Sequence, residues 1–331
     1  MSCVTAAHVL AAADPDRYDV IPVGITREGR WVRADGAEGA GDRLRAEGPE
    51  VQPADVLLDQ PGTIAFPVLH GPFGEDGTAQ GLLEMLGVPY VGAGVLGSAL
   101  CMDKAMAKDA AAAHGLPQVR HLAFRDVDLA DDFFVTMGAI AAELGLPVFV
   151  KPANLGSSVG VTRAADVGEL GTAVKLALAF DEWVVIEEAV TAREIECGVL
   201  GYGRLRASVP GEIRPSHDFY DYEDKYADGA AELLVPAPLP AKVAAEVRRL
   251  AVAAANALRV DGMARVDFFY EQGGRGLLLN EVNTIPGFTP ISMYPKMWAA
   301  TGVPYRQLID ELVDAGLARH RNRAERYGRS R

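Results

Sequence analysis

Two apolar segments joined by a glycine-rich turn constrain the fold of this chain more than any other feature. The segments cover residues 262–270 and 277–283, and the turn between them reads EQGGRG. This pattern predicts a β-hairpin. Because successive side chains of a strand point to opposite faces, Arg265 and Asp267 share one face of the first strand. On the second strand the residues expected to share one face are Leu277, Leu279, Glu281 and Asn283.

One permitted register of this hairpin sets Asp267 opposite Glu281 and Arg265 opposite Asn283. Two carboxylates directly opposite each other on a sheet repel by roughly 0.2–1 kcal/mol unless a cation lies between them. Two carboxylates and an amide oxygen form a set of hard oxygen donors that suits Mg²⁺ carried by a nucleotide. The alternative, a polar outer face of a surface hairpin, is less favoured because the opposite face is apolar. That face holds Val266, Phe268, Leu278 and Val282.

A second motif follows an expected strand at residues 147–151. It reads KPANLGSSVG from Lys151 to Gly160, and its small residues include Ser157 and Ser158. Small side chains and free N–H groups allow close approach of phosphate oxygens, and Lys151 supplies a positive charge beside them. The Walker A pattern is absent. Taken alone, the motif fits a plain hairpin with one exposed lysine equally well.

Several charged residues lie between these two motifs. Glu187 closes an apolar strand at residues 183–187, a suitable place for an adenosine cleft, and Glu188, Glu194 and Lys225-Tyr226 follow it. Each of them alone is more typical of a solvated surface, as is Lys104 within a helix. Among the histidines, His70 is a site candidate because it lies between an apolar strand and a glycine-rich turn.

The order of the predicted elements favours a multidomain chain, since 331 residues exceed what one core usually supports. The first third alternates helices (3–13, 78–86) with strands (18–25, 64–69, 88–92) around a loop at 28–52, which predicts a parallel α/β sheet. The middle forms an α+β unit with strands 119–124, 147–151, 159–163 and 183–187 and helices 103–114, 132–144 and 166–179. The last part adds strands 195–200 and 206–209, a polar segment at 211–230, the hairpin, and helices 241–258 and 304–318. The tail 319–331, with six arginines, is expected to be frayed and solvated.

Charge and cysteine content exclude several classes of function. A net charge of −13 argues against a nucleic-acid partner. The longest apolar runs are too short to span a bilayer, and residues 1–20 lack the pattern of a secretory signal. Cys3, Cys101 and Cys197 are scattered and form no CxxC pair, so neither a disulfide framework nor a zinc site is expected. A cytoplasmic location fits best.

Six segments together resemble the D-alanine–D-alanine ligases, which are ATP-grasp enzymes of peptidoglycan synthesis. They are FPVLHGPFGEDGTAQG (66–81), MDK (102–104), KPANLGSSVG (151–160), KY (225–226), RVD (265–267) and EVNTIPG (281–287). The resemblance covers residues 1 to about 318 and implies an N-terminal α/β domain (1–102) followed by a two-domain ATP-grasp fold (103–190 and 191–331), with residues 211–230 as a lid. It also implies ATP and two Mg²⁺ ions as cofactors, with Mn²⁺ as a substitute. The implied reaction converts one D-alanine into an acyl phosphate, which the amine of a second D-alanine attacks.

The resemblance assigns a role to each candidate residue. The nucleotide contacts are Lys104, Lys151, Ser158, Glu187, Glu188, Glu194 and Lys225, the last reaching the γ-phosphate. The metal ligands are Asp267, Glu281 and Asn283. Groups acting on the substrate are Arg265 and the Gly287 N–H at the developing charge, Ser157 and Tyr226 in an orienting triad, His70, and Ser292 at the carboxylate of the second substrate.

The family comparison leaves alternatives to the leading function. One is a D-alanine–D-lactate ligase, which the Lys225-Tyr226 pair disfavours, and another is an inactive ATP-binding relative. The family begins with a strand and a glycine-rich loop, whereas this sequence opens with a helix at about residue 3. We therefore expect that the start lies about 20 residues too late, a length estimated from one strand and one loop. A homodimer is compatible with the sequence.

Overall fold

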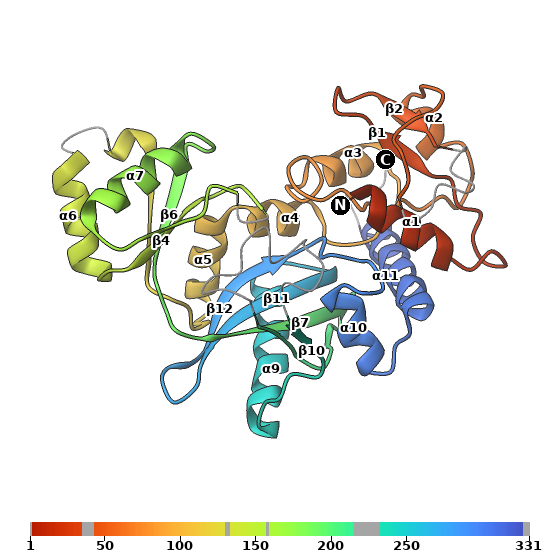
Figure 1. Cartoon of the computed structure of the whole chain (residues 1–331). Coiled ribbons are helices and arrows are strands. Elements are labelled where there is room, and N and C mark those ends of the chain that lie inside the picture. The colour runs from red at the N-terminus through yellow and green to blue at the C-terminus, as the bar shows by residue number, and fades with distance from the viewer. Residues whose placement is uncertain (1, 35–42, 130–132, 157–158, 215–231, 327–331) are drawn as a thin grey trace.

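The chain folds into three parts that lie in a row in Figure 1. The computed structural model describes residues 2–34, 43–129, 133–156, 159–214 and 232–326. A four-stranded sheet with its helices lies at the left of the figure, and a six-stranded sheet lies in the middle. The N-terminal residues pack at the right against the last helix. The mixed α/β and α+β class expected from the sequence is thus observed.

The N-terminal part is built mainly from helices. Its elements are α1 (Ser2–Ala12), β1 (Val23–Ile25), β2 (Trp31–Arg33), α2 (Pro53–Leu57) and α3 (Thr78–Leu86). Strands β1 and β2 pair antiparallel. The strand expected at 18–25 is therefore shorter than predicted, and β2 lies within the segment expected to be a loop.

Among the described residues of this part, the expected parallel pairing is limited to one bridge, between Ala65 and Tyr90. The Ala65 N–H donates to the Pro89 carbonyl and the Val91 N–H to the Ala65 carbonyl, each at 2.9 Å. Longer strands at 64–69 and 88–92 do not form. Proline has no N–H to donate, so Pro67 and Pro89 interrupt a longer ladder.

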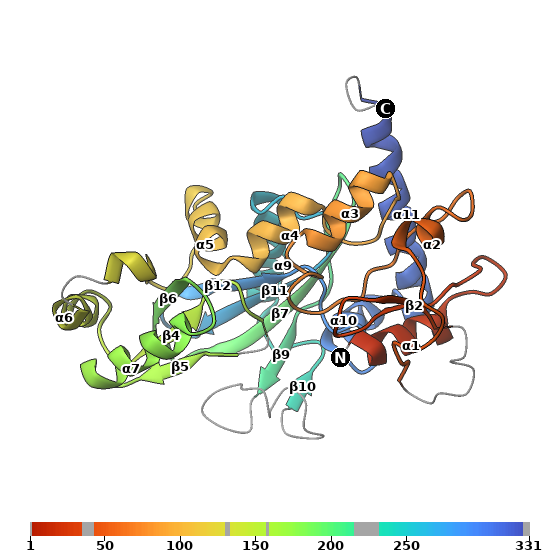
Figure 2. The ribbon, with the colours of Figure 1, turned by 90° about the horizontal axis from the view of Figure 1, so that it is seen from above.

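Two consecutive helices, α4 (Val95–Met102) and α5 (Lys104–Ala113), lead from the N-terminal part over the six-stranded sheet (Figure 2). The sequence predicted α5 but not α4. The carboxylate of Asp103 accepts the Met106 N–H at 3.0 Å and caps α5 as expected. Helix α4 thereby ends where α5 begins, and this places Lys104 in the first turn of α5.

The middle part is a four-stranded antiparallel sheet in the order β3-β6-β4-β5. Its elements are β3 (His121–Arg125), η1 (Asp126–Leu129), α6 (Phe133–Leu144), β4 (Val148–Pro152), β5 (Thr162–Ala164), α7 (Val167–Leu178) and β6 (Trp183–Glu188). Helices α6 and α7 cover one face through a buried cluster that includes Met137, Leu170, Val174, Val148 and Ile186. The strands of this part are shifted by one to three residues from the predicted ranges.

The third part contains the six-stranded sheet, with the order β10-β9-β7-β11-β12 and β8 paired to β7. Its strands are β7 (Arg193–Gly201), β8 (Arg206–Ala207), β9 (Gly211–Arg214), β10 (Glu232–Leu234), β11 (Gly262–Glu271) and β12 (Gly276–Asn283). Helix α9 (Ala241–Ala257) covers its apolar face. The segment expected as a lid at 211–230 begins with β9, and its remainder lies outside the described residues.

The hairpin register predicted from the sequence is confirmed. Arg265 pairs with Asn283 and Asp267 pairs with Glu281. The neighbouring strand β7 sets Glu196 beside Asp267 on the other side of β11. Charged residues from three adjacent strands therefore share the face of the sheet opposite to α9.

A β-bulge corrects the rest of the predicted hairpin pattern. Phe268 pairs with Leu279, so Asn280 is an extra residue on β12. The extra residue reverses the alternation of side chains, and both Leu277 and Leu279 join the core under α9. The expectation that they share a face with Glu281 is wrong.

The last two helices are α10 (Met293–Ala300) and α11 (Tyr305–Ala324), and α10 was not predicted. Helix α11 packs against the N-terminal part (Figures 1 and 2), where Tyr18 donates to Asp310 at 2.6 Å. The tail expected to fray is helical as far as Ala324. Arg319 is only 2% exposed and donates to the carbonyls of Gly92 and Tyr90. The expectation of a solvated tail is therefore wrong for Arg319, which is buried and hydrogen-bonded to two backbone carbonyls.

Candidate active site

A cleft of about 430 Å³ lies between the middle sheet and the charged face of the six-stranded sheet. This volume is in the range of small-molecule sites. Strands β4 and β6 line it from one side and β7, β9, β11 and β12 from the other, with the α4–α5 junction above. Candidate residues that line the cleft are Lys104, Lys151, Glu187, Glu188, Glu194, Arg265, Asp267, Glu281 and Asn283.

The middle-sheet side of the cleft carries a buried carboxylate between two lysines. Lys151 Nζ lies 2.7 Å from Glu187 Oε2, and Lys108 Nζ lies 3.0 Å from Glu187 Oε1. Burial would raise the pKa of Glu187, but the charges of Lys108 and Lys151 outweigh it and lower that pKa to about 2. Burial likewise lowers the pKa of Lys151, and Glu187 outweighs this and raises it. Both groups are therefore ionised at neutral pH.

Lys104 holds the glycine- and serine-rich turn from the side of α5. Its ammonium donates to the Leu155 carbonyl, and its backbone N–H donates to the Ala153 carbonyl at 3.0 Å. The beginning of the turn after β4 is thus fixed against the first turn of α5. This arrangement brings Lys104 and Lys151 to the same end of the cleft.

The opposite side of the cleft concentrates the charges of the hairpin. Arg265 donates to both oxygens of Asp267, at 2.8 and 2.7 Å, and its Nε lies 3.1 Å from Glu196 Oε1. Asn283 Nδ2 donates to Asp267 Oδ2 at 2.9 Å and to Glu281 Oε1 at 3.4 Å. Burial would lower the pKa of Arg265, but Asp267 and Glu196 raise it well above its usual value, so the guanidinium stays charged.

The donor set at this end suits a divalent cation. Asp267 and Glu281 are opposed across the hairpin, and the Asn283 amide lies between their carboxylates. The nitrogen and oxygen of an amide are assigned from its hydrogen bonds, so its other end could offer an oxygen to a cation. Two carboxylates and one amide oxygen match the preference of Mg²⁺ for few protein ligands and hard oxygens. Within the described residues, no group of three or more His, Cys, Asp or Glu side chains forms a larger metal site.

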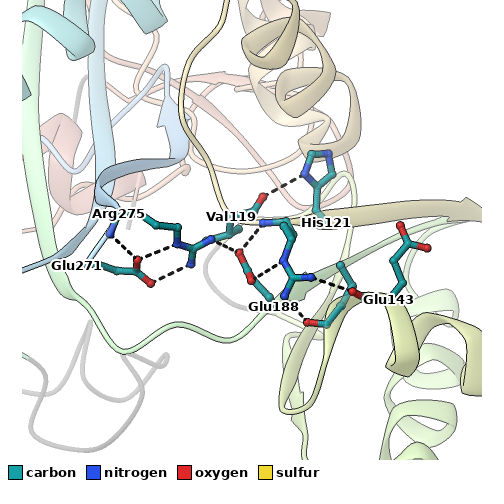
Figure 3. A network of polar contacts seen from close by, with 8 residues as sticks. Val119, His121, Glu143, Glu188, Glu271 and Arg275 are labelled. Carbon is teal, nitrogen blue, oxygen red and sulfur yellow. Dashed lines mark hydrogen bonds and ion pairs between the residues drawn. The ribbon is translucent and has the colours of Figure 1, made fainter. Parts of the chain in front are cut away.

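Glu188 lies in a network of arginine contacts at the junction between the two sheets (Figure 3). Its Oε1 accepts from Arg275 Nη1 at 2.6 Å and from the Arg120 N–H at 2.8 Å, and its Oε2 accepts from Arg120 Nε at 2.9 Å. Arg275 also forms a bidentate ion pair with Glu271, with hydrogen bonds of 2.8 and 2.9 Å. The carboxylate expected to contact a nucleotide thus accepts hydrogen bonds from Arg120, just before β3, and from Arg275, in the turn between β11 and β12.

The remaining candidates on the substrate side lie beside the loop after β12. His70 Nδ1 lies 3.1 Å from the Ile285 carbonyl and its Nε2 lies 3.1 Å from Thr5 Oγ1. A carbonyl only accepts, so Nδ1 carries the proton and Thr5 donates to Nε2. A Cβ atom added at Gly287 would lie 3.2 Å from Ser292 Oγ, so these two residues are neighbours.

Ser292 is held in place within this loop. Its hydroxyl accepts the Thr289 N–H at 3.1 Å and shares a hydrogen bond with Thr289 Oγ1 at 2.8 Å. His70 contacts the loop that carries Gly287 and Ser292, and none of these three residues lines the cleft. Ser157, Ser158, Lys225 and Tyr226 lie outside the described residues.

The sequence interpretation missed Glu196 and Glu75, which line the cleft, and Lys108, which lies beside it. Lys108 follows Lys104 by one helical turn, a spacing that puts both on one face and could have revealed it. Glu75 belongs to the turn that follows His70, and its carboxylate accepts the Gly71 N–H at 2.7 Å. Burial raises the pKa of Glu75 to about 7, and the charge of Glu281 adds to this shift.

Within the part of the chain that the structure describes, no helix combines the length and apolar character needed to cross a membrane. The three cysteines are all free thiols. Cys101 lines the cleft beside Met102.

Comparison with known proteins identifies the relatives of this chain. A family model described as "D-ala D-ala ligase N-terminus" matches residues 1–93, and one described as "D-ala D-ala ligase C-terminus" matches residues 111–314. The chain is 44% identical to the D-alanine–D-alanine ligase of Caldicellulosiruptor bescii, over 98% of this chain and 93% of that protein. It is 48% identical to the one of Synechococcus sp. (strain WH7803), over 92% and 89%.

Solved structures give the same result. The D-alanine–D-alanine ligase of Coxiella burnetii superimposes with a TM-score of 0.80 and 32% identity, covering 97% of this chain and 92% of that one. The Bacillus anthracis D-alanine–D-alanine ligase complexed with ATP superimposes with a TM-score of 0.74 and 28% identity, covering 97% and 94%. None of these names favours the alternatives of a lactate-using or an inactive protein.

Proposed function

The chain belongs to the D-alanine–D-alanine ligase family, and we propose that it joins two D-alanine molecules to D-alanyl-D-alanine with hydrolysis of ATP to ADP and phosphate. It would do so in the cytoplasm, as a source of peptidoglycan precursors. One observation supports the proposal above all others. Lys104 of α5, Lys151 of the middle sheet and the paired carboxylates of the larger sheet all line a single cavity.

In the first step, a carboxylate oxygen of one D-alanine attacks the γ-phosphorus of ATP, ADP leaves, and D-alanyl phosphate forms. We assign Lys104 and Lys151 to the phosphates, where a compact charge is suitable. Glu187, Glu194 and Glu188 are assigned to the adenosine side. The contacts of Glu188 with arginines fix the end of β6 there. Ser158 and Lys225 complete the proposed nucleotide contacts.

The residues Asp267, Glu281 and Asn283 would hold Mg²⁺ brought by the nucleotide. When bound, the metal would offset negative charge on the transferred phosphoryl group, and Mn²⁺ has similar ligand preferences. Arg265 stays cationic and adds a fixed positive charge on the same face.

In the second step, the amine of the second D-alanine attacks the carbonyl carbon of the acyl phosphate. The amine loses a proton, the C–O bond to phosphate breaks, and inorganic phosphate leaves with the electron pair. We assign the Gly287 N–H to the developing oxyanion and Ser292 to the carboxylate of the second substrate. His70 contacts the Ile285 carbonyl, two residues before Gly287, and so holds the start of this loop. Ser157 and Tyr226 would orient the substrates.

The proposal also includes three domains, at residues 1–102, 103–190 and 191–331. The middle sheet ends at Glu188 and the larger sheet begins at Arg193, which supports the second boundary. The segment 211–230 would close over ATP and exclude water.

A coupled assay tests the proposed function. ADP and phosphate are measured with ATP and Mg²⁺ alone, with D-alanine added, and with D-alanine plus D-lactate. We expect ADP and phosphate in equal amounts only when D-alanine is present, and D-alanyl-D-alanine as the product by mass spectrometry. Binding of ATP without turnover, or a predominant D-alanyl-D-lactate product, would overturn the proposal.

A further inference from the structure

Lys108 is buried next to the cleft but does not line it. Its side chain is 4% exposed, and the Glu187 carboxylate that it contacts at 3.0 Å is 3% exposed. It comes from α5, one turn after Lys104. Five residues after the end of this helix, the Gln118 side chain donates to the Lys108 carbonyl at 2.8 Å.

Glu187 and its two lysine partners form a cluster in which the positive charges outnumber the negative charge. Lys108 contacts one carboxylate oxygen and Lys151 the other, so the cluster carries one net positive charge. Lys151 and Glu187 both line the cleft, and Lys151 is the more exposed of the two, with 14% of its side chain accessible against 3% for Glu187. If Lys108 were absent, Glu187 would neutralise Lys151 fully, and the cluster would have no net charge.

The surrounding cleft makes this charge important. Carboxylates of Glu194, Glu281, Asp267 and Glu196 line the cavity, whereas its cationic side chains include Lys104, Lys151 and Arg265. Arg265 already forms a bidentate ion pair with Asp267. A polyanion entering this cavity therefore depends on positive charge that the carboxylates have not cancelled.

We propose that Lys108 is a positioning residue that sets the phosphate affinity of the cleft without touching the nucleotide. It offsets the charge of Glu187 and so leaves the charge of Lys151 available to the phosphates. This inference rests on the proposed function only in taking ATP as the ligand. It assigns to Lys108 a role distinct from packing, because a buried lysine–glutamate pair can be replaced by apolar groups with little loss of stability.

Nucleotide binding without D-alanine separates this role from simple support of the fold. Calorimetric titrations with ATP and with AMP, both with Mg²⁺, compare the wild type with Lys108→Met. We expect ATP affinity to fall on the order of tenfold or more, as for one charge removed at short range. AMP carries fewer phosphates, and its affinity should fall much less. Lys242→Met removes the same charge from the exposed first turn of α9 and should change neither affinity.

A second variant keeps the test independent of folding. In Lys108→Met with Glu187→Gln the buried unpaired carboxylate is gone and Lys151 again provides one net positive charge. The ratio of ATP to AMP affinity should return toward the wild-type value, even if Glu187→Gln weakens both ligands equally. A Lys108→Met variant in which ATP and AMP affinity fall in parallel, or a double variant in which the ratio stays low, would overturn the inference.

These outcomes differ from a failure of the proposed function. A chain that shows the ATP-specific loss but makes no dipeptide would contradict the ligase reaction and leave the role of Lys108 intact. A wild type that binds no ATP would contradict both.

Discussion

The opposed carboxylates of Asp267 and Glu281 have opposite consequences for stability and for turnover. Without a cation they repel, by roughly 0.2–1 kcal/mol for directly opposed charges on a sheet. Glu281→Gln relieves this repulsion but removes a proposed metal ligand. We expect the turnover number at saturating ATP and Mg²⁺ to fall by about 10²-fold or more, with an unchanged or slightly higher melting temperature.

The control for this prediction is Glu246→Gln, which removes an exposed carboxylate on α9 that pairs with Arg249. It should leave turnover unchanged. Near-normal turnover of Glu281→Gln at saturating Mg²⁺ would show that the residue is not a metal ligand.

His70 should remain neutral throughout the physiological pH range. Burial lowers its pKa to about 4, although the Ile285 carbonyl acts in the opposite direction. Unfolded His70 binds its proton near pH 6.5, so between these values the unfolded state holds more protons. Stability is therefore fully present above pH 6.5 and falls as the pH decreases toward 4. The two-dimensional NMR signals of the His70 ring should show no titration above pH 5.5, and a ring that titrates near 6.5 would contradict the buried neutral tautomer.

Glu75 should have the opposite effect on the pH dependence. Burial raises its folded pKa to about 7 from an ordinary 4.5, so its contribution is present below pH 4.5 and is lost as the pH rises to 7. Glu75→Gln should stabilise the protein at pH 8 relative to the wild type and have little effect at pH 4. Urea unfolding at both values measures this difference. A variant equally stable to the wild type at pH 8 would mean that Glu75 is ionised at little cost.

At the scale of residues, the sequence predicted contacts within one hairpin but not contacts between elements far apart in the chain. Asp267 and Glu281 followed from strand alternation and turn chemistry, which are local rules. The contact of Lys108 with Glu187 joins a helix to a strand nearly 80 positions later, and no local pattern reports it. The bulge at Asn280 could not be foreseen either, because it depends on which neighbours fill the core under α9.

At the scale of elements, the tip of the hairpin β11–β12 is tied to the middle sheet by Arg275 and Glu188 (Figure 3). Because the hairpin carries Asp267 and β6 carries Glu187, this link holds the two sides of the cleft at a fixed separation. Arg275 is 43% exposed, so its ion pairs are screened by salt. Arg275→Ala should raise the KM for ATP by roughly threefold at low ionic strength, and the difference should shrink at about 0.5 M salt.

Arg249→Ala provides the comparison for the hairpin link, since it breaks an exposed ion pair on α9. It should leave the KM for ATP unchanged at any salt concentration. An effect of Arg275→Ala that is the same at low and high salt would point to packing of the hairpin tip as its cause.

Helices α4 and α10, which the sequence interpretation missed, both lack an amphipathic pattern. Helix α4 reads VLGSALCM, and at Gly97 a Cβ would lie 2.7 Å from the Arg259 carbonyl, so the helix packs backbone against backbone. Helix α10 reads MYPKMWAA, with Pro295 in its first turn, where proline is tolerated, and it is buried on several sides. Tertiary packing decides such helices. In contrast, periodic apolar residues mark α9, and aspartate caps mark the starts of α5 and α7.

At the scale of the whole molecule, helix α11 joins the end of the chain to its beginning. Its buried face packs with Trp298 and Phe288 of the last part and with Val91, Ile64 and Tyr18 of the N-terminal part. The arginine-rich composition after residue 318 suggested a solvated end, because a sequence does not show which arginine finds acceptors. Here the acceptors are the carbonyls of Tyr90 and Gly92, at the edge of the parallel bridge between Ala65 and Tyr90.

We expect Arg319 to contribute most to the packing of α11 against the N-terminal part. Its guanidinium donates to the carbonyls of Tyr90 and Gly92 and lies 4.2 Å from the centre of the Tyr90 ring. Arg319→Ala would leave two buried carbonyls without their donor and remove the stacking on the aromatic ring. We expect a loss of about 2–4 kcal/mol in the free energy of unfolding. Arg321→Ala, two residues later on the exposed side of α11, should cost less than about 0.5 kcal/mol. Urea unfolding of both variants measures the difference, and equal stabilities would mean that the contacts of Arg319 with the N-terminal part do not hold the molecule together.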